Sequence, residues 1–188
     1  MKIRYNAPVT LTFALVSTSV LLIAGLLGSR DFMTLFTAPG RHGFDSMNPL
    51  SYVRLMSHVA GHVSWQHLLG NFTFILLLGP ILEEKYSSVS LFVMIIITAL
   101  VTGILNVLFF HTALLGASGI AFMMILLMSF TNVRRGEIPV TFFLVIALFL
   151  IKEIVGMFEA NDISEFAHLV GGACGSLFGF LRPRRTKV

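Results

Sequence analysis

Long apolar segments dominate this 188-residue chain, and their length limits what the chain can fold into. A helix of about 20 apolar residues is long enough to cross a lipid bilayer. The sequence holds six such segments, at roughly 9–28, 66–82, 89–110, 118–132, 138–157 and 164–181. Little chain remains for a soluble domain. We therefore predict an all-α polytopic membrane protein: a single membrane domain over residues 1–188, with six transmembrane helices and a long loop at 29–65.

The composition points to the same class and argues against others. Only 12% of the residues are charged, whereas a soluble domain usually has about a quarter. The formal net charge of +4 comes from basic residues in the termini and loops, which fits a membrane topology signal better than a nucleic-acid partner. Cys174 is the single cysteine, so we expect no internal disulfide and no cysteine metal cluster.

The distribution of lysine and arginine predicts the orientation, because cytoplasmic loops of membrane proteins carry an excess of these residues. With the N-terminus in the cytoplasm, nine fall inside and three outside: Lys2, Arg4, Lys85, Arg134, Arg135, Arg182, Arg184, Arg185 and Lys187 against Arg30, Arg41 and Arg54. We therefore expect both termini in the cytoplasm and the loop at 29–65 on the outer side of a prokaryotic inner membrane.

Ser118 opens the fourth segment at an unusual depth. From Ser118 to Arg134 the chain advances sixteen residues, or about 24 Å as a helix, which is short against a bilayer core of about 30 Å. If Arg134 lies at the inner interface, the helix starts below the outer surface, and irregular backbone precedes it. Such backbone occurs in a membrane only where protein buries it or water reaches it, so Ser118 would lie at the floor of a wet cavity.

Three further polar residues are predicted at the same depth. His168 lies about one turn into the sixth segment, while His67 and Asn71 begin the second, and both segments enter from the outer side. The spacing of His67 and Asn71 puts them on one helix face. Ionisable groups inside a membrane are costly and often functional, so we treat these four residues as one candidate site.

Glycines on the sixth segment predict how it packs. They recur every four residues near the face that carries His168, at Gly171, Gly175 and Gly179. A stripe of small residues lets helices approach closely. If the partner is the fourth helix, His168 comes within reach of Ser118, and Phe122 lies under the imidazole.

This set of residues predicts acyl-transfer chemistry. A serine hydroxyl becomes nucleophilic when an adjacent base takes its proton; His168 would be that base, and later the acid that protonates the leaving amine. Asn71, His67 and the backbone N–H of Ser118 would stabilise the oxyanion. No acid is well placed for a triad, since Glu165 is closer to the interface, so a Ser-His dyad is expected.

Each residue alone also has a simpler explanation. Ser118 can be a small packing residue and His168 a hydrogen-bonded core histidine. His67 and Asn71 can cap the second helix or bind a backbone carbonyl. The agreement in depth favours the catalytic interpretation. No cofactor is needed, and no metal is expected, because no carboxylate accompanies the histidines at 58, 62 and 67 at ligand spacing.

Three motifs carry a resemblance to a known family. The stretches HVSWQHLLGN, GASGIAF and HLVGGACG begin at His62, Gly116 and His168. They resemble the H-x-x-x-N, G-x-S-G and H-x-x-G-x-x-x-G motifs of rhomboid intramembrane serine proteases, in that order and over almost the whole chain. The resemblance implies a six-helix rhomboid fold with the following site: Ser118 as nucleophile, His168 as base, His67, Asn71 and the Ser118 backbone as oxyanion hole, and His62, Gly116, Gly119, Phe122, Gly171 and Gly175 as supporting residues.

The resemblance also implies the substrates, which would be single-span or polytopic membrane proteins cut within the lipid bilayer near its outer face. The fifth helix would gate their lateral access. This chain departs from the family twice. Val53-Arg54 stands where the family often has Trp-Arg, which concerns the anchoring of the first loop. Ser87 follows Glu83 where the family often has a glycine four residues after the acid, which concerns a turn.

Two other functions stay open at this point. A non-proteolytic relative would bind or dislocate membrane clients, but such relatives typically lack the serine or the histidine, and this chain has both. A small transporter would need polar groups across the whole bilayer, whereas here they cluster in the outer half. A serine-reactive fluorophosphonate separates the protease from both alternatives.

Overall fold

A computed structural model describes residues 5–28, 30–130, 140, 143–148, 151 and 165–181. The described residues form helices and loops, with no strand among them. The helices are α1 (Pro8–Leu27), α2 (Arg30–Thr34), α3 (Pro49–Ser57), α4 (Trp65–Tyr86), α5 (Ser88–Phe109), α6 (Ser118–Ser129) and α8 (Glu165–Leu181), with the short 3-10 turns η1 (Arg41–Gly43) and η2 (His58–Ala60). The predicted all-α class is confirmed.

The helices follow the predicted apolar segments. By length and composition, α1, α4 and α5 can each cross a membrane. α8 has 17 residues and α6 only 12, so α6 is about 18 Å long at about 1.5 Å per residue. Of the predicted segment 138–157, residues 143–148 are helical, while most of the remainder lies outside the described residues.

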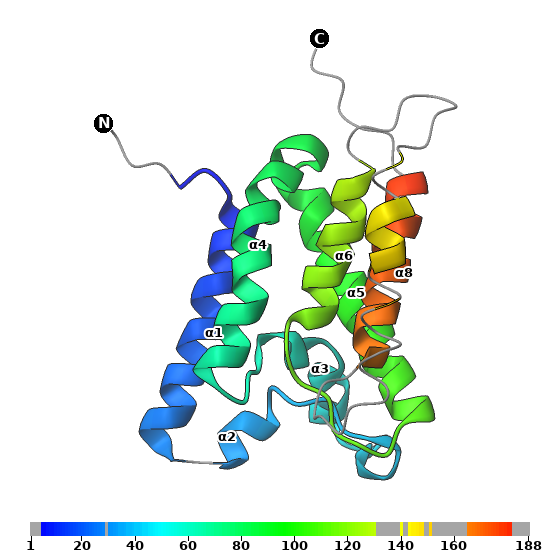
Figure 1. Ribbon diagram of the computed structural model, residues 1–188. Helices are drawn as coiled ribbons and strands as arrows, with labels where there is room; N and C mark the ends of the chain where they lie inside the picture. Colours follow the sequence, from blue (N-terminus) through cyan, green and yellow to red (C-terminus); the bar gives the residue numbers. More distant parts are fainter. Residues whose placement is uncertain are drawn as a thin grey trace.

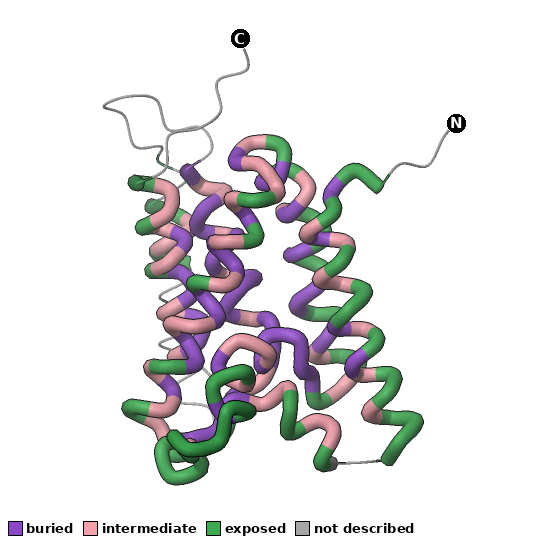
Figure 2. Tube along the Cα trace, turned by 180° about the vertical axis from the view of Figure 1, so that it is seen from behind, coloured by how far each residue is buried: buried purple, intermediate pink, exposed green. Residues whose placement is uncertain are grey.

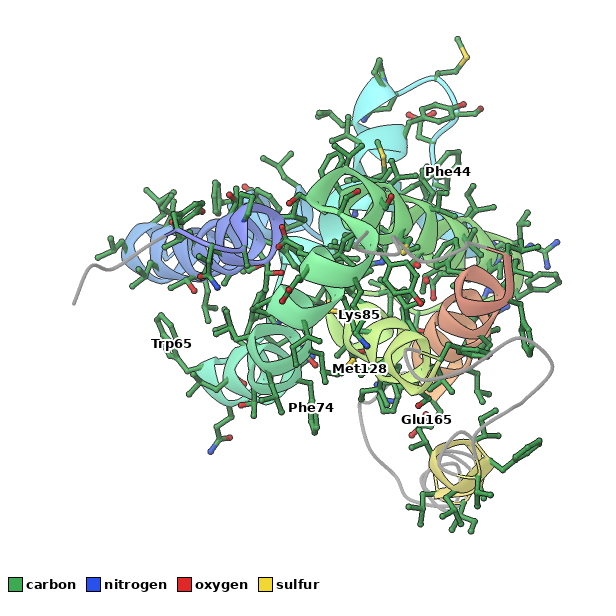
Figure 3. The ribbon with its side chains drawn as sticks, turned by 90° about the horizontal axis from the view of Figure 1, so that it is seen from above. Phe44, Trp65, Phe74, Lys85, Met128 and Glu165 are labelled. Carbon is green, nitrogen blue, oxygen red and sulfur yellow. The ribbon has the colours of Figure 1, made fainter. Side chains whose placement is uncertain are left out.

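α6 forms the centre of the bundle, between α4, α5 and α8 (Figure 1). Ile120, Met123 and Leu127 on this helix have no exposed surface. The outer helices instead expose large apolar side chains, among them Leu26 of α1 and Phe74 of α4, and Phe74 points away from the bundle (Figure 3). Figure 2 shows the same gradient, with buried residues inside and exposed ones outside. An apolar exterior is what a bundle surrounded by lipid requires.

The first loop, residues 30–64, covers one end of the bundle, which we call the loop end. α1 begins and α8 ends at the opposite end (Figure 1). Arg54 anchors this loop, because its Nε donates to the Thr37 carbonyl at 2.7 Å. The Phe44 ring meets Tyr52 edge-on, with 5.3 Å between ring centroids. Arg54 and these rings therefore tie the loop to itself although Val53 stands where the family often has tryptophan.

Ser87 joins α4 to α5 in a single residue. Its φ of 80° and ψ of 153° lie in a region that favours glycine. The Ser87 N–H donates to the Glu83 carbonyl at 2.9 Å, and its carbonyl accepts from the Leu91 N–H at 3.0 Å. Its Oγ accepts from the Ser90 N–H at 3.3 Å. Serine thus ends one helix and begins the next at a position where the family often has glycine.

The start of α1 is fastened to α4 by a buried carboxylate. Glu83 is 5% exposed and accepts from the Thr10 N–H at 2.7 Å, the Thr10 hydroxyl at 2.6 Å and the Val9 N–H at 3.3 Å. The first amides of a helix have no partner within it, so Glu83 satisfies donors that would otherwise face apolar surroundings. A Cβ at Gly79 would collide with the Thr10 side chain, which explains the glycine. We call this region the α1–α4 contact.

Candidate active site

Ser118 is the first residue of α6 and is half-buried. Residues 110–117, which we call the serine loop, lead from the loop end to this point, so α6 begins inside the bundle (Figure 1). Gly116 has φ 126°, and a Cβ there would lie 2.8 Å from Nε2 of His67. The Gly116 N–H donates to the His58 carbonyl at 3.0 Å. Glycine is therefore needed both for the backbone conformation and for the approach to His67.

Glycines bring α6 and α8 into backbone contact, as the sequence predicts for the fourth and sixth segments. A Cβ at Gly171 would collide with the carbonyl of Gly119, and one at Gly175 with the carbonyl of Met123. A Cβ at Gly119 would lie 3.1 Å from the Ala167 carbonyl oxygen. We call this region the α6–α8 contact. At all three glycines the nearest atoms of the facing helix are backbone atoms, which cannot move aside as a flexible side chain can.

The two predicted catalytic residues flank this contact. Ser118 directly precedes Gly119, and His168 directly follows Ala167. His168 is 5% exposed, and the centroid of its ring lies 4.3 Å from that of Phe122, with 34° between the planes. The expected packing of Phe122 against the imidazole is therefore present, and it limits how the imidazole can move.

Asn71 is held by His62, which also contacts the serine loop at Ala117. His62 has no exposed surface, and its Nε2 lies 3.2 Å from Asn71 Nδ2 and 3.4 Å from the Ala117 backbone nitrogen. Both neighbours are N–H donors, so Nε2 is the acceptor and Nδ1 carries the proton, which it donates to the Ala60 carbonyl at 3.3 Å. Burial, and next the neighbouring His67, lower the pKa of His62 to about 4, so the ring stays neutral.

His67 faces Gly116 from the first turn of α4. Ser64, and not His67, caps this helix, since its Oγ accepts from the His67 N–H at 3.1 Å. The imidazole packs edge-on against His62, with 5.0 Å between centroids. Capping therefore does not account for His67. Within the described residues, no three histidine, cysteine or acidic side chains form a group that could hold a metal.

Asn106 lies beside the serine loop and is not among the residues that the sequence analysis singles out. It is 3% exposed, at the end of α5. A signal was available, because Thr98, Thr102 and Asn106 recur every four residues in an otherwise apolar segment. A polar stripe inside a membrane helix marks a face turned toward protein.

Comparison with known proteins identifies similar chains. A family model described as Rhomboid domain matches residues 49–185. The Rhomboid protease GlpG of Haemophilus influenzae is 24% identical over 182 residues, which cover 94% of this chain and 93% of that protein. The Rhomboid protease GlpG of Klebsiella pneumoniae is 27% identical over 186 residues, which cover 95% of this chain and 65% of that longer protein.

Proposed function

Because this chain belongs to the rhomboid family and is an intramembrane serine protease, we propose that Ser118 and His168 form its catalytic dyad. The observation that carries the proposal is the α6–α8 contact. It joins the backbones on which the two residues sit, next to Gly119 and Ala167. Contact between backbones fixes the separation of two side chains more tightly than contact through flexible side chains does.

The reaction uses the dyad twice. His168 takes the proton of the Ser118 hydroxyl as its Oγ attacks the carbonyl carbon of the scissile peptide bond. His168 then gives that proton to the leaving amine when the C–N bond breaks, which leaves an acyl group on Ser118. A water molecule then gives a proton to His168 as it attacks the acyl carbon; the bond from that carbon to the Ser118 Oγ breaks, His168 returns the proton to Oγ, and the new carboxyl end is released. The Phe122 ring packs against the imidazole of His168 and supports it.

Asn71, His67 and the Ser118 backbone N–H stabilise the oxyanion in this proposal. The hydrogen bond to His62 turns the amide nitrogen of Asn71 toward the serine loop, where a Cβ at Gly116 would lie 3.8 Å away from it. One of the two Asn71 N–H bonds is used by His62, and the other remains for the substrate. Donors fixed in advance are worth most where water is excluded.

The substrates are membrane proteins, and we infer that they are cut near the outer face. The protein is integral to the membrane, and rhomboid proteases act within the bilayer. The excess of lysine and arginine at the termini and in the short loops supports placing the end opposite the loop end in the cytoplasm. The site then opens to the outer side of a prokaryotic inner membrane. The expected substrates are single-span or polytopic proteins whose transmembrane helices unwind near that side.

Cleavage of a panel of single-span substrates by purified protein tests the dyad. Ser118→Ala and His168→Ala should each abolish cleavage, and the double variant should be no worse, because residues that act as a unit are not additive. Appreciable cleavage by Ser118→Ala protein contradicts the proposal.

Asn71→Ala tests the oxyanion role separately. We expect kcat to fall about 100-fold or more, with KM changed little, because the charge exists only in the transition state. Melting is measured on the same samples. A variant that melts early in proportion to its lost activity, or one that changes KM alone, would make Asn71 a scaffold residue.

A further inference from the structure

Residues 38–41 of the first loop are hydrogen-bonded to the serine loop. Ala38 and Leu114 exchange two backbone hydrogen bonds, of 2.8 and 2.9 Å, and the Arg41 N–H donates to the Phe110 carbonyl at 2.7 Å. Gly40 fits between them, since a Cβ there would collide with the His111 carbonyl. At the exposed edge, the rings of His42 and His111 stack with centroids 4.7 Å apart. The serine loop thus takes its shape from a segment about 70 residues earlier.

A single side chain, that of Asn106 on α5, is hydrogen-bonded to both the first loop and the serine loop. Its Nδ2 donates to the Pro39 carbonyl at 3.2 Å and to the Thr112 carbonyl at 3.0 Å. Both amide hydrogens are used, one for each loop. Pro39 and Thr112 lie between the backbone hydrogen bonds described above, so the amide acts inside the joined segment and not at its edge. The bond to Pro39 is buried and the one to Thr112 is part-buried, and a buried carbonyl left without a donor would be costly.

The joined loops touch both halves of the proposed dyad. Leu114 lies four residues before Ser118 in the chain. Ala38, Leu114 and Ala167 form one buried apolar cluster, and Ala167 directly precedes His168. A shift of the serine loop would therefore move the start of α6 and the support under α8 together.

We propose that Asn106 is a positioning residue for proteolysis: by holding the Pro39 and Thr112 carbonyls it fixes the serine loop, and through it the relation of Ser118 to His168. The proposal rests on the proposed function of that dyad. It assigns to the backbone of the first loop a part in the chemistry, in addition to the support that the His62 side chain gives to Asn71. A displacement of about 1 Å between reacting groups can cost about 100-fold in rate. A small shift of the serine loop would therefore be enough to slow proteolysis.

Asn106→Leu tests the proposal, since leucine is close in size and donates no hydrogen bond. We expect kcat for a membrane substrate to fall at least about tenfold with KM little changed, and the rate of Ser118 modification by a fluorophosphonate to fall in parallel. Asn106→Gln, which keeps both donors, should recover part of the loss. A structural role alone would lower the melting temperature and leave kcat unchanged in assays well below melting.

Thr98→Val is the matched control on the same helix. Thr98 is also buried, but its hydroxyl donates to the Met94 carbonyl within α5 and its side chain meets Cys174 of α8, with no bond to either loop in the described part of the chain, so kcat should stay near the wild-type value. If Asn106→Leu protein does not fold, Gly40→Ala disturbs the same joined segment and should also lower kcat. Wild-type kcat in whichever of these two variants folds overturns the proposal. Ser118→Ala in the same assay tests the dyad itself, because cleavage by that variant would show that the proposed function, and not only the role of Asn106, is wrong.

Discussion

The α6–α8 contact and the α1–α4 contact both depend on glycine, but they differ in what the glycine meets. Gly171 lies against the backbone of Gly119, whereas Gly79 lies against the side chain of Thr10. At the α1–α4 contact the polar groups bond to one another, because Glu83 accepts three hydrogen bonds from the start of α1. At the α6–α8 contact the adjacent polar residues are the proposed catalytic pair.

This difference separates two uses of helix packing in one bundle. The α1–α4 contact joins polar partners and holds a peripheral helix, so its loss should cost stability. The α6–α8 contact sets a separation between two side chains, so its loss should cost rate even in protein that remains folded. Variants at the two contacts should therefore separate a loss of activity from a loss of stability.

Gly171→Val should have the largest effect. The branched side chain would meet the Gly119 backbone and push α8 away from α6, so we expect kcat to fall about 100-fold or more while Ser118 and His168 remain in place. Gly179→Ala, which meets the Phe130 ring one turn beyond Gly175, should be milder. Full activity of the Gly171→Val variant would show that backbone closeness is not what the site requires.

Glu83→Ala should act in the opposite way. It removes the acceptor of three hydrogen bonds and leaves two buried donors on Thr10 and a half-buried one on Val9, which should lower the free energy of unfolding by about 2 kcal/mol. kcat measured well below melting should stay near the wild-type value. Glu84→Ala changes the exposed neighbouring acid and serves as the control. A selective loss of kcat without earlier melting would remove the distinction between the two contacts.

Acid should weaken the loop end. Burial lowers the pKa of His58 to about 4, and burial with the neighbouring His67 does the same for His62. Below the ordinary pKa of 6.5, these histidines are protonated in the unfolded chain but stay neutral in the folded one. The free energy of unfolding therefore falls as the pH falls from 6.5 toward 4. We expect the melting temperature to drop across this window, and to drop less in His62→Gln protein. A melting temperature that is independent of pH there would contradict the neutral His62 inferred from its partners.

Ser87→Gly should have the smallest effect and the opposite sign. Glycine takes a positive φ without strain, so the free energy of unfolding should rise by up to about 1 kcal/mol, less a few tenths for the lost cap. Ser88→Gly, one residue into α5, should instead destabilise the protein. Thermal melting is measured on both variants. Destabilisation by Ser87→Gly would mean that the cap hydrogen bond of the serine hydroxyl contributes more than the backbone strain at Ser87 costs.

The sequence predicts the parts of this structure that have a local signature. The apolar segments give α1, α4, α5 and α8 to within a few residues, and the glycine spacing predicts that Gly171 faces the serine helix. The imidazole of His168 and the Phe122 ring meet as expected, because both follow from helix period and depth.

Contacts between distant segments have no such signature. The bonds from Glu83 to Thr10 and from Asn106 to Pro39 join residues 73 and 67 positions apart, and no spacing in the sequence pairs them. The positive φ of Ser87 is likewise set by the short connection between two helices, against the preference of serine itself. The tautomer of His62 follows only once Ala60, Asn71 and Ala117 surround it.

The most direct test of the account is to find which atom reacts with a fluorophosphonate and what controls its rate. Purified wild-type protein in detergent is labelled, and the adduct is mapped by mass spectrometry, with His168→Ala, Gly171→Val and Glu83→Ala proteins labelled in parallel. We expect a single adduct on Ser118 that is lost in His168→Ala protein, much slower in Gly171→Val protein and unchanged in folded Glu83→Ala protein. The claim under test is that the α6–α8 contact holds His168 where it activates the Ser118 hydroxyl. An adduct elsewhere, or labelling of Ser118 that does not depend on His168 and Gly171, would contradict it.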